Sequence, residues 1–416
     1  MLTNAEAVPI EGRCDARFSE VMEEFRRNLA ERGDLGASVA VTVGGEPVVD
    51  LWGGFADADR TTPWQQDTIA VVMSCTKGAT ALCAHLLAAA GELDFDAPVV
   101  RYWPEFGQAG KERVLVRHLL SHQAGLPAVR TPLEPGAFYD TERMAAVLAT
   151  EAPFWEPGTA YGYHGLTYGF LVGEVVRRVS GTELGAFFRS EVAEPLGLDF
   201  AIGLPESQHD RVTHLNPAPP PAPGDAVPPF LMRAMTDPTS VQALMMGNTG
   251  GYFVPEAWDS PQALQAVIPA SGGVANARSL AAMYAPLATD GRVGNVTFSA
   301  ADIARMGSVQ SAVGADQVLL GPGRWALGFM KGAVSPAGYD PPARIVLSDD
   351  AFGHLGHGGS IGFADPVAGM SFAYVMNQMA PDMGLSATGQ SLVDAAYRAL
   401  GYEHGHGNWI PIRPPR

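Results

Sequence analysis

Cysteine, lysine and long apolar runs are all scarce in this chain of 416 residues. The three cysteines, Cys14, Cys75 and Cys83, are too few for a disulfide framework. No segment reaches the roughly 20 apolar residues that cross a membrane, and the N-terminus lacks the apolar stretch of a secretory signal. These absences favour a cytoplasmic location and exclude a membrane partner.

Positive charge is also in short supply. The chain has 27 Lys and Arg against 44 Asp and Glu, a net charge of −17. Because nucleic acids bind basic surfaces, no nucleic-acid partner is expected. His118 and His122 have the i, i+4 spacing of a metal-binding pair, but a third ligand is not evident, which favours a structural or capping role. We expect no metal and no cofactor, and nothing in the sequence indicates the oligomeric state.

The first part of the chain carries a helix pattern and then two strand patterns. Residues 18–32 have apolar positions at helical spacing, and strands are expected at 37–44 and 47–54, joined as a hairpin at Gly44-Gly45-Glu46. The apolar stretch from 74 to 91 predicts a helix buried on most sides. From about 95 to 300 the pattern is mainly helical, with helices expected at 113–121, 143–150, 166–180, 183–192 and 278–290.

Strand patterns return near the C-terminus. Strands are expected at 324–331, 343–347 and 369–377, followed by a helix at 385–400. Strands at both ends with helices between them predict an α+β fold of the broad α/β class. One sheet is expected from residues 1–95 and 305–416, and a mainly helical domain, residues 96–304, is inserted.

The first chemical motif is Ser74-Cys75-Thr76-Lys77, between a strand-like run and a helix. Residues three apart share a helix face, so the lysine amine can reach the serine hydroxyl. A buried lysine loses its proton more easily and can then activate the hydroxyl as a nucleophile. With 20 serines and three lysines, chance predicts such a tetrad only about 0.15 times per chain.

Two other interpretations of this tetrad exist. Ser74 could be an ordinary helix cap beside an incidental lysine, although a lysine is unusual in so apolar a helix. Cys75 could be the nucleophile, but its place in a buried helix favours packing in the core.

A cluster of tyrosines precedes the helix expected at 166–180. Tyr161, Tyr163 and Tyr168 lie in or after the turn that begins at Pro157. A tyrosine has an ordinary pKa of about 10, so it acts as a base only where a cation stabilises its phenolate. The three residues alone indicate a packed loop; only a pairing with Ser74 and Lys77 would give one of them a chemical role.

The glycine-rich segment 353–366 contains a literal G-x-S-x-G around Ser360. That motif would make Ser360 the nucleophile of an α/β-hydrolase. The context is unfavourable, because such a serine needs an apolar strand directly before it and a helix directly after it. Glycines here instead allow a substrate to approach the backbone, whose N–H groups can bind an oxyanion.

Together these segments resemble the serine β-lactamase-related hydrolases, and specifically the family VIII carboxylesterases, which are similar to class C β-lactamases and DD-peptidases. The resemblance covers nearly the whole chain and includes VRHLLSHQAGLP at 116–127 and PGTAYGYHGLTYG at 157–169. In the second motif the family's tyrosine lies six residues after the proline, which selects Tyr163. The implied fold is an antiparallel sheet flanked by helices beside a mainly helical domain, with the site between them.

The resemblance implies a catalytic group of Ser74, Lys77 and Tyr163 and an acyl-enzyme on Ser74. The backbone N–H groups of Ser74 and Ser360 would form the oxyanion hole, and His164, His357, Gly358 and Gly359 would contact the substrate.

Two departures from the lactamase pattern bear on the substrate. The tyrosine-any-asparagine motif is replaced by Tyr163-His164-Gly165, and the lysine of the K-T-G triad by His357. Histidine is a cation only at lower pH, which favours neutral esters over anionic β-lactams. We therefore expect a serine carboxylesterase for small, short-chain esters. A β-lactamase or DD-peptidase-like hydrolase, an acyltransferase and a non-catalytic penicillin-binding-like module remain as alternatives.

Overall fold

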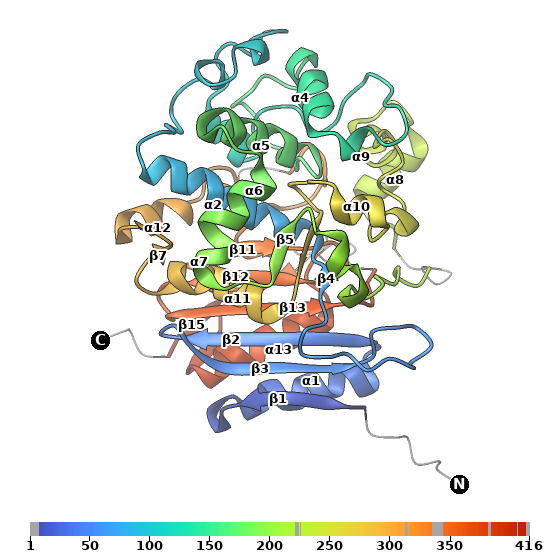
Figure 1. Ribbon diagram of the computed structural model, residues 1–416, viewed down its shortest axis with the longest axis vertical. Coiled ribbons are helices and arrows are strands. Elements are labelled where there is room, and N and C mark those ends of the chain that lie inside the picture. Colours follow the sequence, from blue (N-terminus) through green and yellow to red (C-terminus); the bar gives the residue numbers. More distant parts are fainter. Residues whose placement is uncertain are drawn as a thin grey trace.

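A six-stranded antiparallel sheet forms the lower half of the computed structural model in Figure 1. The structure describes residues 8–220, 224, 226–312, 315–334, 344–381, 384–405 and 407–412. The strand order is β1-β3-β2-β13-β12-β11. These strands come from the two ends of the chain: β1 Ile10–Cys14, β2 Gly36–Val43, β3 Glu46–Gly54, β11 Phe352–Leu355, β12 Ile361–Asp365 and β13 Met370–Met376. The expected fold class is confirmed.

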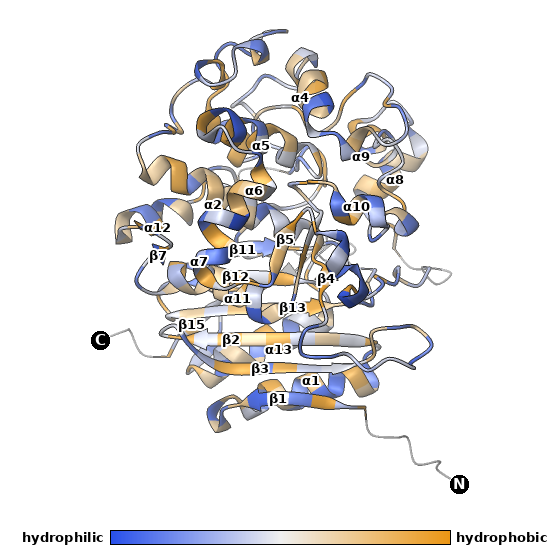
Figure 2. Ribbon diagram, viewed as in Figure 1, coloured by the Kyte–Doolittle hydropathy of each residue, from blue (hydrophilic) through white to orange (hydrophobic). Residues whose placement is uncertain are grey.

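Helices cover both faces of this sheet. Successive residues of a strand point to opposite faces. At Gly362 the strand meets Leu280 of α11 (Ala277–Tyr284), whereas the ring of Phe363 stacks on Tyr397 of α13 (Ala387–Ala399). Helix α1 (Ser19–Glu31) packs beside α13 on the second face. Apolar residues dominate β2 and β13 because both faces of these strands are buried (Figure 2).

Most helices of the segment between β3 and β11 lie above the sheet in Figure 1. At their centre α2 (Thr76–Ala89) packs against α5 (Thr167–Ser180), and α2 is almost fully buried because its residues are small or apolar. The other helices are α3 Val116–Leu120, α4 Thr141–Thr150, α6 Leu184–Phe188, α7 Glu194–Leu196, α8 Pro229–Thr236, α9 Val241–Gly247, α10 Pro261–Gln265 and α12 Ala300–Met306. Among the described residues, no helix combines the length and the apolar character needed to cross a membrane.

Several expected elements are shorter than predicted or irregular. The strand expected at 324–331 is wrong: Trp325 and Met330 make only isolated bridges, and Gly328 has a φ of +86° that breaks an extended strand. Of the strand expected at 343–347, Ala343 lies outside the described residues and only β10 (Arg344–Ile345) forms, paired with β9 (Ala333–Val334).

The helices expected at 113–121, 183–192 and 278–290 also differ from the prediction. The first is reduced to α3. The second is irregular rather than short: α6 is followed by a π-helical turn at Arg189–Ala193 and then by α7. The third ends at Tyr284 and continues as a 3-10 turn, where Pro286 cannot donate a helical hydrogen bond. The boundaries of the two domains, at 95/96 and 304/305, stay a prediction.

Asn377, at the end of β13, joins three segments of the chain. Its Oδ1 accepts a hydrogen bond from the N–H of Gly36, and its Nδ2 donates to the carbonyl of Phe55 and to Oγ1 of Thr213. The side chain is fully buried, so water cannot take its place as the hydrogen-bond partner of Gly36, Phe55 and Thr213 when it is removed.

We expect Asn377→Ala to lower the free energy of unfolding by about 3 kcal/mol, because buried polar groups lose their partners. Urea denaturation measures this change. The matched control is Gln378→Ala, at a half-buried neighbour whose Nε2 donates to the carbonyls of Pro217 and Met379, where less than about 1 kcal/mol is expected. Equal losses in the two variants would contradict this assignment.

Candidate active site

Ser74 lies in a tight turn between a short strand and α2. Strand β4 (Ala70–Val71) pairs with β6 (Gly273–Ala275), and a 3-10 turn at Met73–Cys75 then leads into the helix. Met73 has a φ of +47°, which is costly for a residue with a side chain and is typical of functional turns. The strained turn places Ser74 at the start of α2, where it is half-buried rather than enclosed.

Lys77 lies one helical turn further on and is fully buried. Its Nζ is 2.9 Å from Oγ of Ser74, 2.7 Å from the carbonyl oxygen of Gly165 and 2.9 Å from that of Ala270. Burial lowers the pKa of Lys77 well below its ordinary value, since no carboxylate compensates the charge. A neutral amine donates its two protons to the two carbonyls, which leaves its lone pair directed at the hydroxyl of Ser74.

Tyr163 approaches the same hydroxyl from the loop before α5. Its O–H donates to Oγ of Ser74 at 2.8 Å. Burial raises the pKa of Tyr163 well above its ordinary value, so the phenol is protonated at neutral pH. When Lys77 is neutral, the hydrogen bonds run in one direction, from Tyr163 to Ser74 and from Ser74 to the amine of Lys77.

The other two tyrosines of the cluster lie elsewhere. Tyr161 donates its O–H to the carbonyl of Gly323 at 3.2 Å. Tyr168 belongs to α5, and the centroid of its ring is 6.0 Å from Nζ of Lys77. Of the three, only Tyr163 contacts Ser74 in the described part of the chain, as the position after Pro157 predicted.

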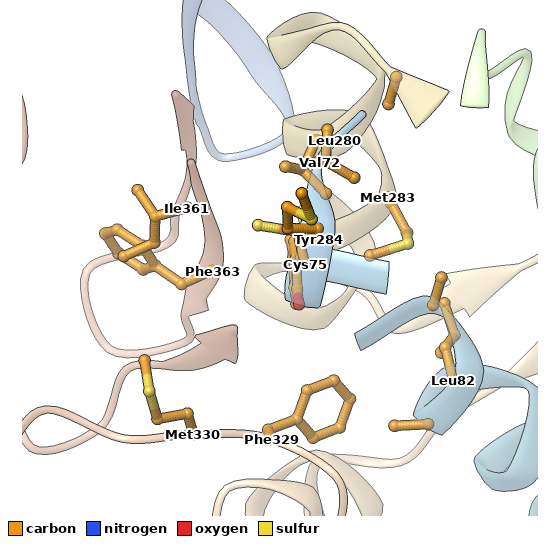
Figure 3. Packing of buried hydrophobic residues seen from close by; sticks show 14 of the residues in the cluster. Val72, Cys75, Leu82, Leu280, Met283, Tyr284, Phe329, Met330, Ile361 and Phe363 are labelled. Carbon is orange, nitrogen blue, oxygen red and sulfur yellow. The ribbon is translucent and has the colours of Figure 1, made fainter. Parts of the chain in front are cut away.

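Cys75 points away from this site, as expected for a core residue. It packs with Val72, Leu280 and Tyr284 (Figure 3). Its S–H donates to the carbonyl of His354 at 3.3 Å, and burial raises the pKa of the thiol above its ordinary value. A thiol of this kind is a poor nucleophile.

The glycine-rich segment lies directly against the turn that bears Ser74. A Cβ on Gly356 would be 2.4 Å from the carbonyl oxygen of Val72, so only glycine allows this approach. Ser360 follows in the turn between β11 and β12, with no helix after it. Its Oγ is buried and has no hydrogen-bond partner among the described residues. The alternative of an α/β-hydrolase with Ser360 as nucleophile is therefore wrong, since that serine lacks both the turn and a base.

His357, Gly358 and Gly359 form the rest of this turn. Gly358 and Gly359 have φ values of +94° and +126°, and a Cβ on either would collide with Met379 or Ser386. His357 is half-buried beside Phe253 and Trp258, with ring centroids 6.0 and 5.9 Å apart, and burial lowers the pKa of its imidazole. It is therefore uncharged at neutral pH.

The structure contradicts the predicted substrate contact of His164. Its ring is fully buried; Nε2 accepts from the N–H of Leu126, and Nδ1 donates to the carbonyl of Gly162. Both nitrogens are thus used to fix the loop that carries Tyr163. The motif gives the position of a residue along the chain but not the side to which it points.

Several residues of the site were not predicted from the sequence. The carbonyls of Gly165 and Ala270 hold the amine of Lys77, the ring of Trp325 stacks on Tyr163 with centroids 5.1 Å apart, and Asp316 accepts the N–H of Tyr163. Of these residues, only Gly165 could have been found from the sequence, because it is the last position of the motif that begins at Tyr163. No group of three or more His, Cys, Asp or Glu that could hold a metal occurs in the described ranges.

We expect Gly356→Ala to lower the free energy of unfolding by about 1–3 kcal/mol, because the new methyl group overlaps the backbone next to Ser74. Thermal denaturation provides the measurement. Gly247→Ala is the matched control: a Cβ there meets nothing within 4 Å, and the variant should be neutral or slightly more stable. A neutral Gly356→Ala would show that the close approach is not required.

Comparisons with known proteins show the family of this chain. The sequence profile of the family described as Beta-lactamase matches residues 23–396. The chain is 35% identical to the Esterase/beta-lactamase LipL of Mycobacterium tuberculosis, over 88% of this chain and 83% of that protein. The crystal structure of a family VIII carboxylesterase is 38% identical in sequence, with a TM-score of 0.82; the match covers 94% of this chain and all of that one. The structure of a penicillin-binding protein homologue from Caulobacter crescentus is also 38% identical, with a TM-score of 0.79 and the same coverage of both chains. The chain belongs to the beta-lactamase family.

Proposed function

We propose that this protein is a serine carboxylesterase that hydrolyses small carboxylic esters through an acyl-enzyme on Ser74. The observation that carries the proposal is the group of three side chains at one oxygen: Lys77 Nζ at 2.9 Å and Tyr163 Oη at 2.8 Å from Oγ of Ser74. Similarity to the family VIII carboxylesterase and to LipL, which is named as an esterase, supports ester hydrolysis.

Acylation begins with the hydroxyl proton of Ser74. The neutral amine of Lys77 takes this proton as Oγ bonds to the ester carbonyl carbon, because its lone pair already faces the hydroxyl. The tetrahedral intermediate then loses its alkoxide. The Lys77–Tyr163 pair returns one proton to the leaving oxygen, so an alcohol departs and Ser74 remains esterified.

The oxyanion of the intermediate requires hydrogen-bond donors. The backbone N–H groups of Ser74 and Ser360 are the candidates, since Gly356 packs the glycine-rich turn against the turn of Ser74 and the N–H of Ser360 is not used by another described residue. In deacylation a water gives its proton to the same lysine–tyrosine pair and attacks the acyl carbon, and Oγ regains a proton as the acid departs.

The substrate side of the site favours neutral esters over anionic β-lactams. His357 occupies the place of a lysine that would bind a carboxylate, and its burial lowers its pKa, so no cation stands there at neutral pH. His357, Gly358 and Gly359 remain the proposed substrate contacts. A β-lactamase, a DD-peptidase or an acyltransferase of the same fold is not favoured, and the complete group of Ser74, Lys77 and Tyr163 is inconsistent with a non-catalytic module.

We expect Ser74→Ala to lower kcat for p-nitrophenyl butyrate by at least about 10³-fold, because the nucleophile is lost. Ser360→Ala is the control and should stay within about 5-fold of wild type, since its proposed role is carried by the backbone N–H. Full activity in Ser74→Ala would refute the proposed function. Nitrocefin turnover as fast as ester turnover would favour the β-lactamase instead.

We expect kcat/KM to fall as the pH is lowered through the pKa of Lys77, because the protonated amine cannot accept the proton of Ser74. Since burial lowers that pKa well below 10.5, the loss of activity should occur at a lower pH than the ordinary pKa of a lysine would give. Lys77→Arg, a permanent cation, should lose about 10²–10⁴-fold at every pH. Lys331→Arg is the control, because Lys331 donates to the carbonyl of Gly307 rather than to Ser74, and it should retain the wild-type profile. An unchanged profile in Lys77→Arg would exclude Lys77 as the base.

A further inference from the structure

Asp316 is a fully buried carboxylate next to Tyr163. Its Oδ1 accepts three backbone hydrogen bonds, from the N–H of Tyr163 at 3.0 Å and from those of Val318 and Leu319 at 2.8 Å each. Two of these bonds stay within its own loop. The third crosses to the loop that presents the phenol to Ser74.

The other carboxylate oxygen is left unpaired. Oδ2 of Asp316 has no hydrogen-bond partner among the described residues, and no ion pair within that part of the chain includes this carboxylate. Burial raises its pKa to about 6, only partly offset by the backbone donors. An incompletely satisfied buried charge destabilises a fold, and an asparagine could bind the same N–H groups without it.

Trp325 packs against the ring of Tyr163. The two rings stack with centroids 5.1 Å apart and an interplanar angle of 11°. The indole also lowers the pKa of Asp316, although its Nε1 makes no hydrogen bond to a described residue in this conformation. Tyr163 is thus held at its backbone by Asp316 and at its ring by Trp325.

The loop of Asp316 is fixed from its other side by α9. Gln242 is buried, and its Nε2 donates to the carbonyls of Gln317 and Val318 at 2.9 and 3.0 Å. The N–H of Gln317 in turn donates to the carbonyl of Tyr161 at 3.0 Å. These contacts give Asp316 a fixed place from which to hold Tyr163.

We propose that Asp316 is a positioning residue for the esterase reaction, which holds the backbone of Tyr163 while Trp325 stacks the ring, so that the phenol stays directed at Oγ of Ser74. The proposal rests on the proposed function. Asp316 does not touch the reacting atoms; it acts through Tyr163.

The charge of Asp316 acts in the same direction as its hydrogen bond. Burial shifts the pKa values of the other titratable groups that face Tyr163 towards their uncharged forms: Lys77 on α2, Cys75 in the turn before it, His122 after α3, Tyr168 on α5 and His354 on β11. Tyr161 faces Asp316 and is also protonated. The carboxylate therefore disfavours a phenolate at Tyr163 and keeps a proton available for the leaving group.

A double-mutant cycle with Tyr163→Phe tests this role. We expect Asp316→Ala to lower kcat for p-nitrophenyl butyrate about 10–100-fold, with KM within about 3-fold, because a proton donor is misplaced while the substrate site remains. In the Tyr163→Phe background the same substitution should lower kcat by no more than about 3-fold, since the group through which it acts is already gone. Asp316→Asn keeps the acceptor oxygen and should recover kcat to within about 5-fold of wild type.

Asp34→Ala is the matched control. Asp34 is also buried with a pKa raised to about 6, but its partner is the hydroxyl of Tyr374 on the central sheet. The Asp34→Ala substitution should lower the stability of the protein and leave kcat unchanged. Equal losses of kcat from Asp316→Ala in the two backgrounds, or a loss no larger than that of Asp34→Ala, would overturn the proposal.

Two further variants keep the test decisive. If Asp316→Ala does not fold, Trp325→Leu takes its place in the cycle, with Trp325→Phe as the variant that retains a stacked ring and kcat within about 3-fold of wild type. Additive losses with Trp325→Leu would then reject the proposal. An active Ser74→Ala would instead overturn the proposed function itself, so the two failures are distinguishable.

Discussion

A lysine amine kept out of water without an opposing carboxylate is the constraint on which the rest of the site depends. The cost of burying a charge is large, and here the amine meets only carbonyl oxygens and a hydroxyl, so its pKa lies well below the ordinary value. Burial has the same effect on two nearby histidines: it lowers the pKa of His354 to about 3 and that of His164 to about 4. The free site therefore holds few charges, and attack by Ser74 creates an ammonium and an oxyanion together in a medium where they attract strongly.

Close backbone contact is the second requirement. The turn of Ser74 and the glycine-rich turn approach so tightly that a methyl group at Gly356 would overlap Val72. Met73 stores strain at the same place, with a positive φ and a side chain. The sheet, α2 and α5 supply the packing that holds this geometry, because each is buried and none can shift without exposing apolar surface.

The sequence predicted those elements that depend on residues close to one another in the chain. The hairpin at Gly44-Gly45, the helices α1, α2 and α5, and the spacing of Ser74 and Lys77 follow from periodicity and turn chemistry, and the resemblance located Tyr163. Asp316 lies 153 residues from the tyrosine that it holds, in no recognisable motif, so only the fold brings the two together. The error at His164 has a different origin, since neighbouring residues of a loop point to opposite sides. The apolar stretch 324–331 resembles a strand but is bent at Gly328.

The pairing of β2 with β13 has a consequence for biosynthesis. Thr42 and Ser371 share a hydrogen bond across the middle of the sheet although 329 residues separate them. While the ribosome is still adding the helical segments, the N-terminal hairpin has one edge with no neighbour, and such an edge invites pairing with other nascent chains. Long-range pairing of this kind is also slow. Completion of the last strands is therefore the event that gives the edge of β2 its neighbour, β13.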